Sequence, residues 1–80
     1  MDKKLRLRIL MDPKVMIGKP VIKGTRIPVE LIVRMAGQGI PEAIILKEYP
    51  NLKPLDIRAA LTYAAEVLAN EDIFPFDIPA

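Results

Sequence analysis

The chain has 80 residues, which is enough for one domain with a small hydrophobic core. It contains no cysteine and no histidine, so disulfides, thiolate metal sites and a histidine general base are excluded. Its formal net charge is +2, but residues 1–26 hold eight Lys or Arg and two Asp, whereas residues 59–80 hold four acidic residues and no basic one.

The first third of the chain predicts a small β meander. Charged and apolar residues alternate over residues 4–9, which is typical of a strand with one buried face. A turn at residues 11–14 and return strands at residues 15–17 and 20–23 would follow. Three short strands cannot cover their own apolar face, so we expect them to pack on helices or, preferably, on the strands of a homodimer partner.

A junction rich in glycine and proline separates the alternating pattern from a helical one. Six residues form its signature: Gly18, Pro20, Gly24, Thr25, Arg26 and Pro28. The two glycines permit a positive φ angle, and the two prolines fix φ. The Thr25 hydroxyl is placed to cap backbone N–H groups where the next helix begins. We expect Arg26 to anchor the strand to that helix through hydrogen bonds, and phosphate binding at this turn is the alternative.

Three helices are predicted after this junction. Apolar residues recur at helical spacing from Val29 until the glycine-rich stop at Gly37. A short second helix is expected between Pro41 and Tyr49, and an alanine-rich third helix starts at Pro54. The pattern predicts a mainly α fold, in which a short N-terminal β meander precedes a homeodomain-like trihelical helix-turn-helix core.

The expected organisation is a single domain with three parts. These are an N-terminal β arm over residues 1–24, the trihelical helix-turn-helix core over residues 25–70 and an acidic, aromatic tail over residues 71–80.

The junction also carries a resemblance to a known family. The run Gly-Lys-Pro-Val-Ile-Lys-Gly-Thr-Arg-Ile-Pro-Val over residues 18–29 resembles the signature of the domain-of-unknown-function 433 family, small prokaryotic proteins usually regarded as VapB-like antitoxins. Gly39, Tyr49 and the segment 56–64 fit the second half of that family. The resemblance implies a helix-turn-helix protein that is often encoded beside a PIN-like nuclease toxin.

The chain departs from the family pattern at three positions. Ile17 stands where a second glycine is common, and Pro41 and Lys53 stand where the family tends to place Ser or Thr as helix N-caps. A missing cap costs about 1 kcal/mol. Asp56 in the first turn of the third helix is expected to recover part of that cost through the helix dipole.

Two groups of residues are candidates for DNA binding. If the third helix lies in a major groove, its outward N-terminal residues make the contacts, although Asp56 alongside them has the wrong sign for a phosphate-rich surface. The basic N-terminal arm supplies affinity with little sequence discrimination. The candidate set is Lys3, Lys4, Arg6, Arg8, Lys53, Arg58 and Thr62.

The tail is the candidate site for a protein partner. It is broken by two prolines and combines large apolar side chains with acids, namely Ile73, Phe74, Phe76 and Ile78 with Asp72 and Asp77. Such residues suit the groove of a partner, and the resemblance implies a PIN-like nuclease whose metal centre is ringed by basic residues. The alternative is that the tail folds back onto its own domain.

No pattern of carboxylates or tyrosines predicts catalysis, so we expect no enzyme activity, no cofactor and no metal site. No apolar run reaches the ~20 residues of a membrane span, and the start does not read as a signal peptide. We therefore expect a cytoplasmic, homodimeric antitoxin that neutralises a PIN-like nuclease and binds operator DNA. The alternative is a dimeric protein-interaction module without DNA binding.

Overall fold

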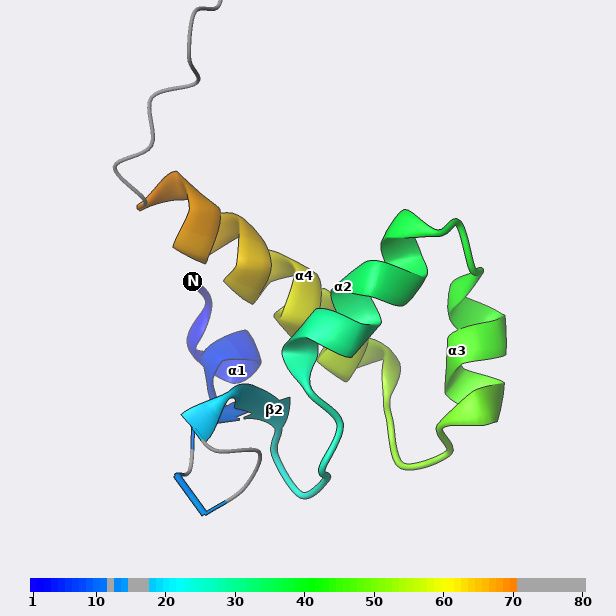
Figure 1. The fold of residues 1–80 in the computed structure, drawn as a ribbon, viewed down its shortest axis with the longest axis horizontal. Coiled ribbons are helices and arrows are strands. Elements are labelled where there is room, and N and C mark those ends of the chain that lie inside the picture. Colours follow the sequence, from blue (N-terminus) through cyan, green and yellow to red (C-terminus); the bar gives the residue numbers. More distant parts are fainter. Residues whose placement is uncertain (12, 15–17, 71–80) are drawn as a thin grey trace, which may run out of the picture.

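The computed structural model describes residues 1–11, 13–14 and 18–70. Within these ranges the fold is mainly helical with one small sheet (Figure 1). The elements in chain order are α1 (Lys3–Arg6), β1 (Ile9–Met11), β2 (Pro20–Ile22), α2 (Val29–Gly37), α3 (Glu42–Glu48) and α4 (Pro54–Ala69). The two strands pair antiparallel, with Ile9 opposite Ile22 and Met11 opposite Pro20.

The strand predicted for residues 4–9 is wrong, because the chain begins with a single helical turn. The carboxylate of Asp2 caps this turn by accepting a hydrogen bond from the backbone N–H of Lys4 at 3.1 Å. Leu5 is buried, whereas Leu7 is 57% exposed. One helical turn therefore buries a single leucine of the alternating run, where a strand would have buried every second residue.

The β strand starts only at Ile9, and the expected strand at residues 15–17 lies outside the described residues. The described sheet consequently has two strands, so the full meander is not seen.

α2 begins where the sequence predicts, because Pro28 sits at its N-cap with φ of −70° and an extended ψ of 146°. The helix buries Val29, Ile32 and Met35. Its C-terminal end is followed by Gly39, whose φ of +80° reverses the chain toward α3. The prediction of helices in the second part of the chain is confirmed.

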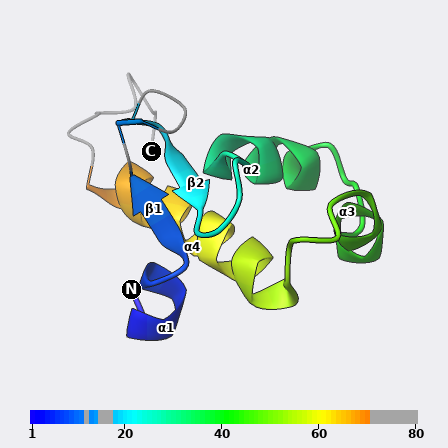
Figure 2. The ribbon, with the colours of Figure 1, turned by 90° about the horizontal axis from the view of Figure 1, so that it is seen from below.

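The core forms between α2 and α4, with the sheet packed at one end of this pair and α3 at the other (Figure 2). Its buried members are Ile22, Val29, Ile32, Met35, Ile45, Leu52, Ile57 and Ala60. α4 packs against both α2 and α1, and the small side chains of Ala59 and Ala60 are fully buried there. α4 is thus the element on which the N-terminal segment and the other helices assemble.

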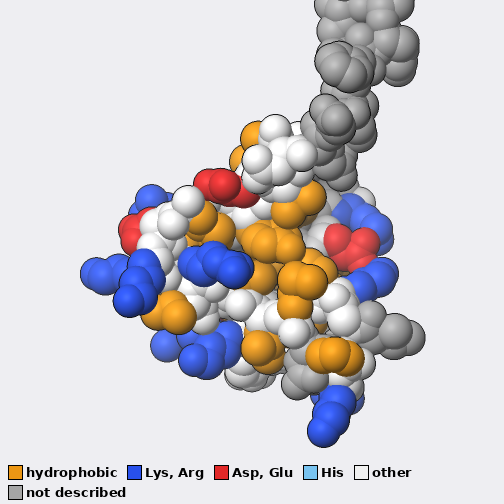
Figure 3. All heavy atoms as spheres, turned by 90° about the vertical axis from the view of Figure 1, so that its left-hand side faces the viewer, with side chains coloured by type: hydrophobic (Ala, Val, Ile, Leu, Met, Phe, Trp, Pro, Cys, Tyr) orange, Lys and Arg blue, Asp and Glu red, His pale blue; other side chains and the backbone are white. Residues whose placement is uncertain are grey.

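Several large apolar side chains stay at the surface, including Leu68, which is 67% exposed at the end of α4. On the face drawn in Figure 3, hydrophobic side chains gather in the centre and Lys and Arg side chains lie around them. Among the described residues, no helix has the length and apolar character needed to cross a bilayer.

Candidate functional site

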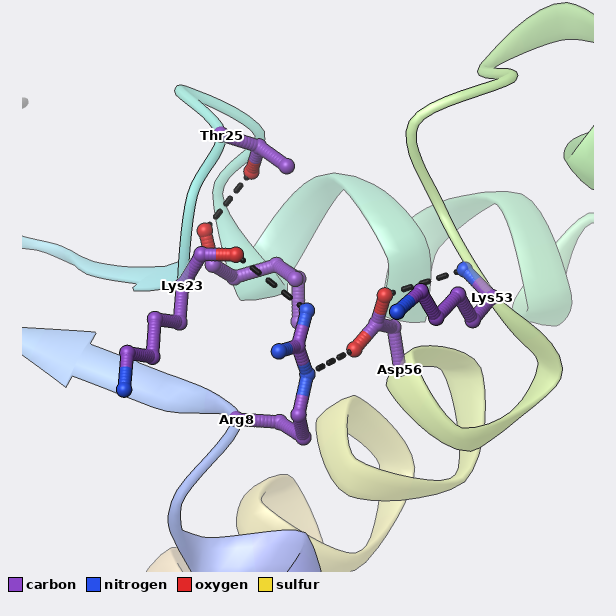
Figure 4. A network of polar contacts seen from close by, with 6 residues as sticks. Arg8, Lys23, Thr25, Lys53 and Asp56 are labelled. Atoms are coloured by element: carbon purple, nitrogen blue, oxygen red, sulfur yellow. Dashed lines mark hydrogen bonds and ion pairs between the residues drawn. The ribbon is translucent and has the colours of Figure 1, made fainter.

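A buried ion pair joins the N-terminal segment to the start of α4 (Figure 4). Arg8 donates from Nε to Oδ1 of Asp56 at 2.5 Å, and the Asp56 side chain is fully buried. The second carboxylate oxygen of Asp56 accepts the backbone N–H of Lys53 at 2.9 Å. Asp56 therefore caps α4 from its third position and neutralises Arg8 at the same time.

Arg8 also reaches the turn after β2. Its Nη2 donates to the carbonyl oxygen of Lys23 at 3.2 Å, and the Lys23 N–H donates to the Arg8 carbonyl at 2.8 Å. The expectation that Arg8 lies outward with the DNA-binding cations is thus not met, because its guanidinium has intramolecular partners. Asp56 likewise faces inward, so the predicted unfavourable carboxylate on the outer face of the third helix is absent from that face.

The signature turn after β2 is held by its own side chain. Thr25 donates from Oγ1 to the Ile22 carbonyl at 2.7 Å and accepts the Ile27 N–H at 3.0 Å. Gly24 has a φ of +81°, which favours glycine. The Thr25 hydroxyl therefore organises the turn itself, and the N-cap position of α2 belongs to Pro28.

Arg26 lies exposed in this turn and makes no hydrogen bond or ion pair with any described residue. The expectation that Arg26 anchors the strand to the helix is therefore wrong. The anchoring contacts come from Thr25 and from the backbone pair between Ile22 and Ile27, whose N···O distance is 3.0 Å.

A basic groove lies beside α1 and the sheet. It has a volume of about 490 Å³, and its lining residues are Lys3, Arg6, Leu7, Ile9, Leu10 and Lys23. Two of the predicted DNA-binding cations, Lys3 and Arg6, meet there with Lys23, which sequence reasoning did not single out. The excess of cations in residues 1–26 was the available signal for Lys23. None of the three cations has an acidic partner among the described residues.

The other predicted DNA-binding residues lie elsewhere. Lys4 is exposed on α1, while Lys53 and Arg58 are exposed at the start of α4 and Thr62 is half-buried one turn later. They are not among the residues that line the basic groove. The predicted partner-binding residues from Asp72 to Ile78 lie outside the described residues.

An apolar groove runs between α2 and the second half of α4. It has a volume of about 290 Å³, and its lining residues are Pro20, Val29, Glu30, Val33, Tyr63, Ala64, Val67 and Leu68. Glu30 at its margin accepts a hydrogen bond from Lys19 Nζ at 2.8 Å. That bond and the Lys19 charge hold the pKa of Glu30 below its ordinary value of 4.5, with a smaller contribution from Arg34.

The described residues contain no group of three or more acidic side chains that could hold a metal ion. The arrangement offers two binding surfaces, a basic one beside α1 and the sheet and an apolar one between α2 and α4.

A family model and a solved structure indicate the same family for this chain. A protein-family model described as "Protein of unknown function (DUF433)" matches residues 9–64. An uncharacterized protein of Archaeoglobus fulgidus is 68% identical over 28 residues, which cover 35% of this chain and 78% of that protein. A crystal structure of a DUF433 member protein from Anabaena variabilis is similar with a TM-score of 0.74 and 34% identity. That match covers 84% of this chain and 66% of the other, so this chain spans just under two thirds of its crystallised relative.

Proposed function

The chain belongs to the DUF433 family, and from this premise we propose that it is an antitoxin-like protein that binds operator DNA and neutralises a PIN-like nuclease. The single observation that carries the proposal is the concentration of cations in the first third of the chain. The chain has a formal net charge of +2, but residues 1–26 alone hold eight Lys or Arg and only two Asp. Such a surface attracts the phosphate backbone of nucleic acid.

We infer that α2, α3 and α4 form a helix-turn-helix of the homeodomain type, with α4 as the helix that approaches the major groove. Residues 49–53 join α3 to α4, which is a connection short enough for that motif. Lys53 and Arg58 are both exposed at the start of α4. The inward position of Asp56 supports this inference, because its carboxylate is paired with Arg8 and does not oppose phosphate.

The nuclease part of the proposal is supported by the chemistry of residues 71–80. This segment combines three acids with four large apolar side chains and carries no cation. A partner site that is lined with basic RNA-binding residues around a metal centre has complementary charge. We propose that the segment competes there with RNA.

DNA binding is tested by fluorescence anisotropy with the DNA upstream of the chain's own gene. We expect Lys53→Gln with Arg58→Gln to weaken binding and to reduce the slope of log K against log salt by about 0.9 for each lost phosphate contact. Lys47→Gln is the matched control, because Lys47 is an exposed cation on α3. Absence of any salt-sensitive binding by the unaltered chain would remove the DNA part of the proposal.

The nuclease part is tested by co-expression with a PIN-like protein encoded beside the chain. We expect the two to co-purify and growth arrest to be relieved. Phe74→Ala with Phe76→Ala should weaken the complex, because large buried aromatic groups dominate interface energies. A complex of unchanged affinity would place the contact elsewhere on the chain.

A second candidate function is a dimeric protein-interaction module without DNA binding, and the apolar groove between α2 and α4 favours it. Val67 and Leu68 are 41% and 67% exposed along that groove. We expect Leu68→Glu to lower the dimer fraction in sedimentation equilibrium, because a buried unpaired charge opposes association. Ile44→Glu is the control, since Ile44 is 46% exposed on α3. A monomer at all concentrations contradicts this candidate.

A further inference from the structure

The basic groove beside α1 is unusual because it combines unpaired cations with exposed leucines. Lys3, Arg6 and Lys23 supply positive charge, and Leu7 and Leu10 are 57% and 39% exposed. A nucleic acid backbone would use the cations but would leave the leucines in contact with water. A ligand that matches both features is an acidic segment with large apolar side chains.

A second hollow shares one lining residue with this groove and extends to the end of α4. It has a volume of about 350 Å³, and its lining residues are Met1, Arg6, Tyr63, Glu66, Val67 and Asn70. Arg6 lines both hollows, and Asn70 directly precedes the segment 71–80. The amino group of Met1 lies 3.0 Å from Oε1 of Glu66, and Figure 1 shows the N-terminus beside the last turns of α4. Asn70, the last described residue, therefore lies in the same hollow as Arg6.

The chemistry of residues 71–80 matches the groove. The segment holds Glu71, Asp72 and Asp77 and no basic residue. Its large apolar side chains are Ile73, Phe74, Phe76 and Ile78. Pro75 and Pro79 prevent a regular helix, so the segment is suited to an extended course.

The segment is also long enough to reach the groove. Ten extended residues span about 33 Å. The two shorter dimensions of the molecule are 29 and 24 Å. A short tether raises the effective concentration of a linked segment into the millimolar range, which favours the chain's own groove over that of a second copy at dilute concentration.

We propose that residues 71–80 bind in the basic groove of their own chain, with their acids on Lys3, Arg6 and Lys23 and their apolar groups on Leu7 and Leu10. Docking covers the cations of α1 and Lys23, which follows β2, and so acts as an internal competitor of nucleic acid. This last consequence rests on the proposed function, whereas the docking itself does not.

Disulfide trapping tests the docking directly, because the chain has no cysteine of its own. Leu7→Cys with Phe76→Cys is the test pair, and Ile44→Cys with Phe76→Cys is the control pair on α3. Leu7 and Ile44 are 57% and 46% exposed, so substitution at either position should leave the fold intact, which circular dichroism checks. We expect the test pair to cross-link at least about tenfold faster than the control pair.

Mixing protein of normal and heavy isotope content separates links within a chain from links between chains. Products of a single isotope type and monomer mass support docking in the same chain. Mixed-isotope dimers as the main product, or equal rates for the test and control pairs, overturn it.

A second measurement uses full-length chains without cysteine. We expect Asp72→Asn with Asp77→Asn to shift the backbone amide resonances of Leu7, Leu10 and Lys23, while Glu42→Gln with Glu48→Gln on α3 leaves them in place. Unchanged resonances for the tail variant overturn the docking. DNA anisotropy on the same variants is a separate readout. Cross-linking without DNA binding supports the docking and rejects the DNA role. DNA binding without cross-linking supports the DNA role and rejects the docking.

Discussion

The guanidinium of Arg8 and the carboxylate of Asp56 meet at an Nε to Oδ1 distance of 2.5 Å although they are 48 positions apart in the chain. Asp56 is fully buried, whereas the Arg8 side chain keeps 25% of its exposure. The pair fixes the N-terminal segment on the first turn of α4, and the Arg8 contacts with Lys23 add the turn after β2 to the same network.

Removing one partner of this pair should destabilise the fold strongly. We expect Asp56→Ala to lower the free energy of unfolding by about 3 kcal/mol, because it leaves a half-buried guanidinium unpaired and also removes the cap of α4. Urea denaturation followed by circular dichroism measures the change. Lys19→Ala is the control, since it breaks an exposed ion pair and should leave the stability nearly unchanged. Equal losses of unfolding free energy for both substitutions would show that the Arg8–Asp56 pair stabilises the fold no more than the exposed Lys19–Glu30 pair does.

The Lys19–Glu30 pair should contribute a small pH dependence. Lys19 holds the pKa of Glu30 below 4.5, so the folded state favours the charged carboxylate. The contribution is therefore present above pH of about 4.5 and is lost as the pH falls through the lower folded value. NMR titration of the Glu30 side chain measures the pKa, and Lys19→Gln should raise it toward the ordinary value. A pKa that does not move in this variant contradicts the assignment.

The two hydrogen bonds of the Thr25 hydroxyl should stabilise the turn after β2. We expect Thr25→Val to lower the free energy of unfolding by about 1 to 2 kcal/mol, since the Ile27 N–H loses its partner and the Ile22 carbonyl keeps only the Thr25 N–H. Thr25→Ser keeps the hydroxyl and should retain most of the stability. If the valine and serine variants unfold alike in a thermal melt, the hydroxyl is not what holds this turn.

Arg26 should contribute little to stability, although it lies next to Thr25. Its side chain is exposed and has no partner among the described residues, so Arg26→Ala should change the free energy of unfolding by less than about 0.5 kcal/mol. Chemical denaturation measures the change. A loss as large as that of Thr25→Val would mean that the guanidinium anchors the turn after all.

The extra strain of a side chain at Gly24 provides a separate test of the same turn. No atom lies within 4 Å of an added Cβ, so the cost of Gly24→Ala should come only from its φ of +81°. We expect a loss of about 1 kcal/mol. Gly37→Ala is the control, because Gly37 is helical and has similar open space. Gly37→Ala should stabilise α2 slightly, and a comparable loss at both positions would contradict the conformational explanation.

Local patterns in the sequence were sufficient to predict the helices in the second part of the chain. Pro28 and the helical spacing after Val29 predict α2, and Pro54 with the alanine-rich run predicts α4, as the structure confirms. These features act within one or two turns of helix, so neighbouring residues decide them. The same applies to Gly24, whose positive φ follows from the turn that it occupies.

The conformation of the N-terminal segment and the grouping of charges at the surface were decided by tertiary structure. Residues 4–9 alternate as a strand would, yet Leu5 is buried by packing of α1 on α4, and the Asp2 cap favours one helical turn there. The partner of Asp56 could not be read from the sequence, because Arg8 is distant along the chain and one of twelve possible cations. Long-range packing also brings Lys3, Arg6 and Lys23 together in one groove, which the sequence does not reveal. Local periodicity determined the helices, whereas long-range packing alone decided which charges are buried as pairs and which remain free to bind.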